Sequence, residues 1–302
     1  MIKRDEYWLK AAQTQSIEFP KSINLHLTER CNYGCRFCFS RHCGLRKELN
    51  FNDWKKIIEE IISYGCEKIN FAGGEPTLIP FLPDLIEFTS NKCKFTSIIS
   101  NGTGISQEFL NQFGSDLKLV GLSIDSANNL VEKRLGRTLK SEFNCGYSQF
   151  SHVESIKECT KLIHECKIPL KINTVLLKWN VCEDFHELIL SLNPIRWKVL
   201  EMHRIDGINS WFLDQVGPLQ CGQIDLFRNV HSDLNPVIER TQDILESYCM
   251  ITPDGRFYQD TNNRHHYSRP ILKIGAKNAI SEVIFSEEKY LARKGGYFEE
   301  MM

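Results

Sequence analysis

The sequence predicts an α/β fold, a partial (β/α)6 barrel with an irregular C-terminal extension packed on it. Alternating apolar and polar residues, typical of strands, recur up to residue 205, and amphipathic helical stretches separate them. About six such βα units follow one another, which is the arrangement that builds a parallel sheet with helices outside. The motifs described below fall where strands end, and in barrels the loops at those ends carry the reactive residues.

The expected strands and helices follow from the spacing of their apolar residues. In the first helix Trp54, Ile57, Ile58 and Ile61 share one face, and Gly65 closes it. Strands are expected at 22–28, 68–72, 95–102 with its turn, 117–125, 171–177 and 197–202. Helices are expected at 53–64, 83–90, 106–113, 150–166 and 183–192.

The pattern changes after residue 205. Residues 206–247 are polar and irregular, and 248–260 are typical of a hairpin with a Pro-Asp-Gly turn. We therefore divide the chain into a barrel, residues 1–205, and an extension, residues 206–302, that contributes to the substrate pocket.

Composition excludes several classes of protein. A net charge of −1 gives no global basic field for nucleic acid or an anionic membrane. No stretch approaches the roughly 20 apolar residues of a membrane span, and the first residues lack the apolar core of a signal peptide. Twelve cysteines without an export signal indicate a reducing compartment. We expect a cytoplasmic protein that binds neither nucleic acid nor membrane.

Three cysteines lie within eight residues, in the run CNYGCRFC formed by Cys31, Cys35 and Cys38. Thiolates hold iron–sulfur clusters, and three ligands leave one iron of a four-iron cluster without a protein ligand. That open iron can bind a small molecule through its amine and carboxylate. The alternative is a zinc site completed by His42 or Cys43, or three unrelated thiols.

A second motif follows about 35 residues later in the run KINFAGGEP, Lys68–Pro76. Its apolar alternation predicts a strand that ends at Gly73 and Gly74. Glycines at this place let a backbone approach a ligand closely, because no Cβ intervenes. The cysteine triad followed by GGEP after a strand resembles the signature of radical S-adenosylmethionine (SAM) enzymes.

Three strands carry cations where a barrel interior is expected to be apolar. Side chains alternate along a strand, so each cation lies opposite an apolar neighbour that packs under the helices. The lumen-facing residues are then Lys68, Asn70, Lys171, Asn173, Arg196 and Lys198. Four buried cations without partners are costly and need a polyanion, for which a triphosphate is the natural candidate. The alternative is that they reach solvent or pair with Glu75 or Asp125.

A wider set of runs resembles the viperin family and spans nearly the whole chain. NPIRWKV, which begins at Asn193, is far more specific than the cysteine triad. The other runs are NLHLT, CNYGCRFCF, KINFAGGEP, SIISNG, GLSIDS, RLGR, KINTV and, more weakly, Tyr248 and LARKGGY.

The resemblance implies a radical SAM barrel with a [4Fe-4S] cluster, SAM and a nucleoside triphosphate, CTP or UTP. The implied reaction removes the ribose 4′ hydrogen and loses the 3′ hydroxyl as water. It gives a 3′-deoxy-3′,4′-didehydro nucleotide, an antiviral chain terminator. The cluster ligands are Cys31, Cys35 and Cys38. The implied SAM contacts are Gly73, Gly74, Glu75, Ser100, Asn101, Ser123 and Arg137. The implied triphosphate contacts are Lys68, Lys171, Asn173, Arg196 and Lys198, and Tyr248 is implied to deliver a hydrogen atom or proton.

The same resemblance implies an electron donor, a reductase or a flavodoxin or ferredoxin. This chain departs from the vertebrate proteins, which carry an amphipathic N-terminal membrane helix and a C-terminal tryptophan, so a soluble prokaryotic-type member is expected. Ala72 replaces the usual serine before GGEP. Alternatives are another radical SAM reaction, such as GTP cyclisation or peptide maturation, or a non-catalytic metal-binding interaction module. Enzymes of GTP cyclisation and peptide maturation commonly carry further C-terminal cysteines for a second cluster. Here Cys221 and Cys249 stand alone, which argues against those two reactions.

Overall fold

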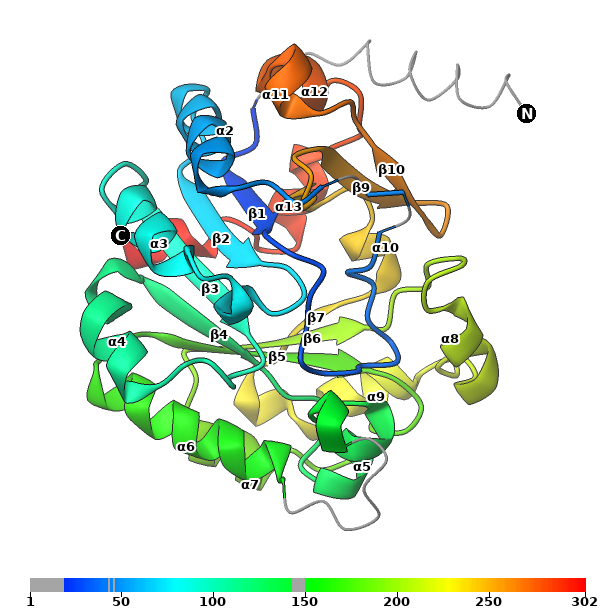
Figure 1. Ribbon diagram of the computed structural model, residues 1–302. Helices are drawn as coiled ribbons and strands as arrows, with labels where there is room; N and C mark the ends of the chain where they lie inside the picture. The colour runs from blue at the N-terminus through cyan, green and yellow to red at the C-terminus, as the bar shows by residue number, and fades with distance from the viewer. Residues whose placement is uncertain (1–18, 43, 46, 143–149) are drawn as a thin grey trace.

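A curved, mostly parallel sheet forms the centre of the computed structural model, which describes residues 19–42, 44–45, 47–142 and 150–302 (Figure 1). The strand order within the described residues is β10-β9-β8-β1-β2-β3-β4-β5-β6-β7. The strands are β1 Ser22–His26, β2 Lys68–Ala72, β3 Phe95–Ser100, β4 Leu119–Ser123, β5 Leu170–Leu176, β6 Arg196–Glu201, β7 Val237–Glu239, β8 Cys249–Ile251, β9 Phe257–Thr261 and β10 Arg264–Tyr267. Because β10 and β7 are the two edges and do not pair, the predicted partial barrel is confirmed.

Helices cover the outer, convex side of this sheet (Figure 1). The first helix of the described residues begins after Asn50, whose side chain accepts the backbone N–H of Asp53 at 3.1 Å and so satisfies one free helix donor. The helices are α2 Phe51–Ser63, α3 Leu82–Ser90, α4 Gln107–Phe113, α5 Asn129–Leu135, α6 His152–Glu165, α7 His186–Leu192, α8 Ser210–Val216, α9 Gln223–Val230, α10 Thr241–Ile244, α11 Ile271–Ile274, α12 Ala276–Ile280 and α13 Glu287–Ala292. The predicted helices lie within two or three residues of these bounds.

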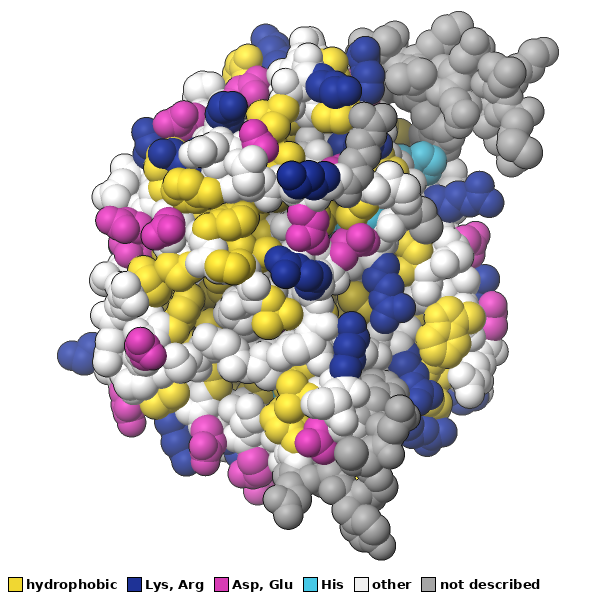
Figure 2. All heavy atoms as spheres, viewed as in Figure 1, with side chains coloured by type: hydrophobic (Ala, Val, Ile, Leu, Met, Phe, Trp, Pro, Cys, Tyr) yellow, Lys and Arg dark blue, Asp and Glu magenta, His cyan; other side chains and the backbone are white. Residues whose placement is uncertain are grey.

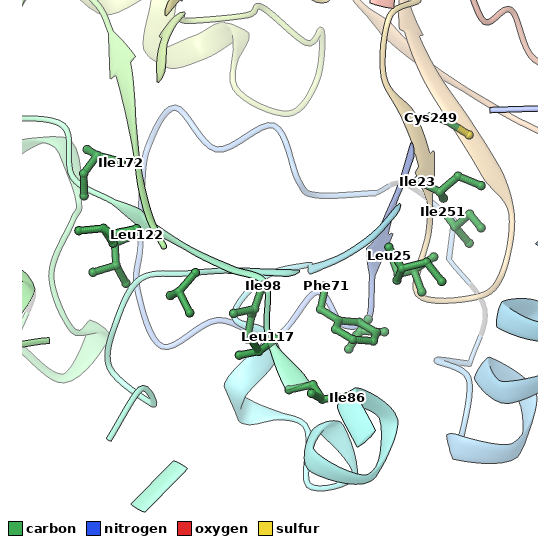
Figure 3. Packing of buried hydrophobic residues seen from close by; sticks show 14 of the residues in the cluster. Ile23, Leu25, Phe71, Ile86, Ile98, Leu117, Leu122, Ile172, Cys249 and Ile251 are labelled. Carbon is green, nitrogen blue, oxygen red and sulfur yellow. The ribbon is translucent and has the colours of Figure 1, made fainter. Parts of the chain in front are cut away.

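The main hydrophobic core lies between the sheet and these helices. Figure 3 shows Phe71 and Ile98 pointing away from the lumen, toward Ile86 of α3. All three side chains are fully buried. Because side chains alternate along a strand, packing one set under the helices turns the other set of β2 and β3 into the lumen.

The segment after residue 205 adds strands to both sides of the predicted sheet. β7 pairs in parallel with β6, and β8 pairs in parallel with β1. The predicted hairpin is confirmed, since β8 and β9 pair antiparallel around a turn in which Gly255 has φ +78°. β7 has three residues, which is too short for alternation to reveal it.

Candidate active site

A cavity of about 660 Å³ opens at the C-terminal ends of the strands and extends down the lumen. A volume of this size suits a drug-sized ligand. Its wall contains every predicted site residue except Arg196. These residues are Cys31, Cys35, Cys38, Lys68, Gly73, Gly74, Glu75, Ser100, Asn101, Ser123, Arg137, Lys171, Asn173, Lys198 and Tyr248.

The cysteine loop follows β1 directly and is held by backbone contacts at several points. The Arg36 N–H donates to the Leu135 carbonyl at 2.9 Å, and the Lys140 N–H donates to the Asn32 carbonyl at 2.8 Å. Asn209 donates its side-chain amide to the Phe37 carbonyl at 2.9 Å. Segments far apart in sequence therefore fix this loop across the open end of the lumen (Figure 1).

The spacing of the three thiols bears on the choice between a cluster and a zinc ion. Zinc binds thiolates at about 2.3 Å in a tetrahedron, which brings the sulfur atoms within about 4 Å of one another. Within the described residues, only Asp184, His186 and His231 place three ligand atoms within 4.8 Å of one another, so the three cysteine sulfurs are spread more widely. Without a metal, the chain therefore does not hold these thiols in the arrangement of a tetrahedral zinc site. Cys43, the other zinc ligand considered, lies outside the described residues.

Burial keeps two of these thiols protonated in the metal-free chain. It raises the pKa of Cys31, and it raises the pKa of Cys35 to about 12. Metal binding requires the thiolate, so assembly of a cluster here releases protons.

The glycines of GGEP are required by a close approach between two stretches of backbone. A Cβ on Gly74 would lie 2.2 Å from the Arg30 carbonyl oxygen, and one on Gly73, at φ +146°, would lie 2.8 Å from that of Thr28. The Gly74 N–H donates to the Thr28 carbonyl at 2.6 Å. The end of β2 is thereby fastened to the start of the cysteine loop, a role that the sequence did not suggest.

Glu75 connects the ends of β2 and β3. Its fully buried carboxylate accepts the Ser100 hydroxyl and the Asn101 backbone N–H, both at 2.8 Å, and both polar groups of Thr77. Burial nevertheless raises the pKa of Glu75. The Asn101 amide donates to Asn32 in the cysteine loop at 2.8 Å and lies 3.9 Å from the sulfur of Cys31.

Ser123 ends β4, the strand beside β3, and Arg137 lines the same cavity. Arg137 Nε pairs with the buried Asp125 at 2.5 Å, so the carboxylate of Asp125 serves this arginine and not the lumen cations. The Ser123 carbonyl is 2.9 Å from His152 Nε2, and His152 Nδ1 is 3.0 Å from the hydroxyl of Tyr33 in the cysteine loop. These contacts connect the end of β4, through His152, to the loop that carries the three cysteines.

Three of the four predicted cations point into the lumen, as alternation requires. Lys68, Lys171 and Lys198 are each about 95% buried, and they line the cavity opposite Ile69, Ile172 and Val199 of the core. Burial, reinforced by neighbouring cations, holds the pKa of Lys68 and of Lys171 well below the ordinary lysine value. A polyanion bound here would remove that repulsion. Asn173 Nδ2, between them, is a buried donor without a partner in the described chain.

Some of these cations have partners within the chain. This corrects the expectation that all four are unpaired. Lys198 Nζ lies 2.6 Å from Glu239 Oε1, a carboxylate other than the two considered from the sequence. Lys68 Nζ donates to the Tyr297 hydroxyl at 2.7 Å. Arg196 lies beside the cavity, with its guanidinium 4.2 Å from the Tyr297 ring centre.

Three further residues of the extension face these cations and were not predicted. They are Glu239, Arg293 and Tyr297. The only sequence signal was the run LARKGGY, which contains the last two. Arg293 adds a fifth cation to the site, with its guanidinium 3.7 Å from the ring centre of Tyr248.

The fold and this site define a radical SAM protein, and the Radical SAM superfamily model matches residues 25–192. Two curated relatives extend the match beyond the barrel. An S-adenosylmethionine-dependent nucleotide dehydratase of Flammeovirga pacifica is 33% identical over 91% of this chain and 95% of its own length. The RSAD2 enzyme of the same name from Siniperca chuatsi is 31% identical over 96% of this chain and 82% of its own. The chain belongs to this family of nucleotide dehydratases, which confirms the resemblance to viperins.

Solved structures support the fold. Streptococcus suis SuiB bound to S-adenosylmethionine matches with a TM-score of 0.65 at 14% identity, over 96% of this chain and 71% of that one. Native anSMEcpe with bound AdoMet matches with a TM-score of 0.60 at 16% identity, over 90% of this chain and 82% of that one. Radical SAM enzymes use a [4Fe-4S] cluster and SAM, and Cys31, Cys35 and Cys38 line the cavity together. None of the helices in the described part of the chain is long and apolar enough to cross a membrane.

Proposed function

We propose that this protein converts a nucleoside triphosphate, CTP or UTP, to its 3′-deoxy-3′,4′-didehydro analogue with loss of water, a product suited to terminating viral RNA chains. The observation that carries the proposal is the shared cavity: the three thiols of the cysteine loop lie at its mouth, and five cations lie in or beside its floor. Neither a zinc module nor a peptide-modifying enzyme needs a buried cationic floor. The names of the relatives support the nucleotide.

The residues divide between two ligands in this proposal. Cys31, Cys35 and Cys38 hold the cluster. The SAM side is formed by Gly73, Gly74, Glu75, Ser100, Asn101, Ser123 and Arg137. The triphosphate side is formed by Lys68, Lys171, Asn173, Arg196 and Lys198, with Tyr248 beside the sugar. When bound, the cluster and SAM supply the radical that removes the 4′ hydrogen. The chain's own part is to hold C4′ within near-attack distance by anchoring the phosphates at the opposite end of the cavity.

Residues 206–302 complete this site in our proposal, because they supply Glu239, Tyr248, Arg293 and Tyr297. We further propose a cytoplasmic location and an external electron donor, a reductase, flavodoxin or ferredoxin. Figure 2 shows Lys and Arg side chains along the face that the cysteine loop crosses. Near the cysteine loop, Arg41 and Lys140 are exposed and also belong to the cavity wall. Their positive charge favours an electron donor with an acidic surface.

Isotope transfer tests the proposed reaction. With 4′-deuterated CTP, we expect deuterium in the 5′-deoxyadenosine formed by the reduced holoenzyme, and a nucleotide product lighter by one water. Mass spectrometry of both products measures this. Comparison of CTP, UTP, GTP and ATP sets the base preference. Deuterium retained in the nucleotide while SAM is cleaved would refute abstraction at C4′, and cleavage stimulated by no triphosphate would refute the proposed substrate class.

A further inference from the structure

Glu239 is the only carboxylate that the described residues place in contact with the cations of the lumen. It ends β7 and is 1% exposed. Its Oε1 lies 2.6 Å from Lys198 Nζ and 3.4 Å from Arg293 Nη1. Its Oε2 accepts the hydroxyl proton of Tyr248 at 2.5 Å. One buried carboxylate therefore joins two cations of the site to Tyr248, the residue that we place beside the sugar.

The contacts of Tyr248 determine which residue its hydroxyl group donates to. Lys198 Nζ donates to the hydroxyl oxygen, so the proton itself points to Glu239. The guanidinium of Arg293 covers the ring and donates to the Ser247 carbonyl at 2.9 Å, while Gln259 donates to the Tyr248 carbonyl. The ring is fixed on both its face and its backbone. The resting arrangement thus stores the tyrosine proton on the side of Glu239.

A bound triphosphate changes the charge balance around this carboxylate. In the free chain Lys198 and Arg293 outweigh burial and hold the pKa of Glu239 below its ordinary value. Other charged or titratable groups that face it are Lys171, Arg196, Tyr248 and Tyr297. Phosphate oxygens compete for the same cations and bring negative charge. A buried carboxylate that shares its cations with phosphate is driven toward its neutral form.

We propose that Glu239 takes up a proton when the triphosphate binds and passes it, through the Tyr248 hydroxyl, to the hydroxyl group that leaves the sugar as water. This rests on the proposed function. The Glu239 O–H bond breaks as Tyr248 accepts that proton and releases its own to the departing oxygen. That oxygen leaves with the electron pair of the C3′–O bond, which leaves the sugar as a radical cation. One electron from the proposed external donor then gives the neutral nucleotide with its 3′,4′ double bond. Tyr248 ends unchanged, Glu239 ends as a carboxylate, and neither exchanges an electron. Glu239 is thus a positioning residue that acts through Tyr248.

Calorimetry can count this proton. CTP is titrated into the holoenzyme at one pH in HEPES and in Tris, whose ionisation enthalpies differ. The wild type is expected to take up about one proton more per CTP than Glu239→Gln. The variant is expected to bind CTP more tightly, because a competing carboxylate is gone, while its turnover falls at least about 100-fold with the loss of the acid. Tyr248→Phe is the matched control, expected to lose turnover and keep the proton uptake.

Each result has a defined meaning. Equal proton counts in wild type and Glu239→Gln, with both binding CTP, would overturn the inference and leave the proposed function standing. Failure of the wild type to bind any triphosphate would instead overturn the proposed function. Weaker CTP binding by a folded Glu239→Gln would show a structural role only. Infrared difference spectra of the wild type need no variant: CTP should convert one carboxylate band to a carboxylic acid band, and its absence would also overturn the inference.

Discussion

Cys35→Ala is expected to remove both the iron and all SAM cleavage while the barrel stays folded. Reconstituted wild type should hold about four irons per chain, since three cysteines bind one four-iron cluster. Loss of any of the three thiolates leaves too few ligands for the cluster. Iron analysis, the visible spectrum of the anaerobic protein and the yield of 5′-deoxyadenosine measure this effect, and circular dichroism checks the fold.

Cys93→Ala is the matched control for that experiment. Cys93 is also buried, but its thiol donates to the Glu67 carbonyl at 3.1 Å outside the cavity. It should keep its iron and its activity. About eight irons per chain in the wild type would contradict a single cluster, and an iron-free, zinc-loaded protein with normal stability would favour the interaction-module alternative.

The lumen of the barrel was predictable because alternation along a strand is strict. Lys68 and Lys171 had to face away from Ile69 and Ile172, and the buried outer face of the sheet left only the lumen. The cysteine triad and the glycines were predictable because few other patterns satisfy the same spacing. Local rules of this kind act over a few residues, and they determined most of the barrel and both ends of the cavity.

Contacts between distant segments could not be predicted in the same way. Glu239 reaches Lys198 from a three-residue strand in a polar stretch, so no periodicity marked it. Its pairing with Lys198 depends on β7 lying beside β6, which only the complete sheet decides. The internal bonding of Glu75 was hidden for the same reason, because Ser100 and Asn101 come from the next strand. What the sequence indicated was a set of lumen charges, and the fold determined which of them are already neutralised.

That distinction makes Lys171 the sharpest test of the triphosphate site. It has no hydrogen-bond or ion-pair partner among the described residues, whereas Lys198 has Glu239. Lys171→Met keeps most of the length of the side chain and removes the charge. Loss of a charge-assisted phosphate contact costs about 1.5–3 kcal/mol, so CTP should bind about ten- to hundredfold more weakly. The exposed Lys118→Met is the matched control and should bind CTP as the wild type does.

The same substitution should stabilise the protein without ligand, because an uncompensated buried cation opposes folding. Burial and nearby cations hold the pKa of Lys171 well below its ordinary value, so the folded chain releases this proton at lower pH than the unfolded chain. Between those two pKa values the unfolded chain binds more protons, and there the stability of the wild type rises with pH. The gain from Lys171→Met should therefore be largest at low pH, where both the folded and the unfolded chain bind this proton, and shrink as the pH approaches about 10. Thermal unfolding with and without CTP measures both effects. A variant less stable than the wild type without CTP, yet equal to it in affinity, would show that Lys171 supports the barrel and not a polyanion.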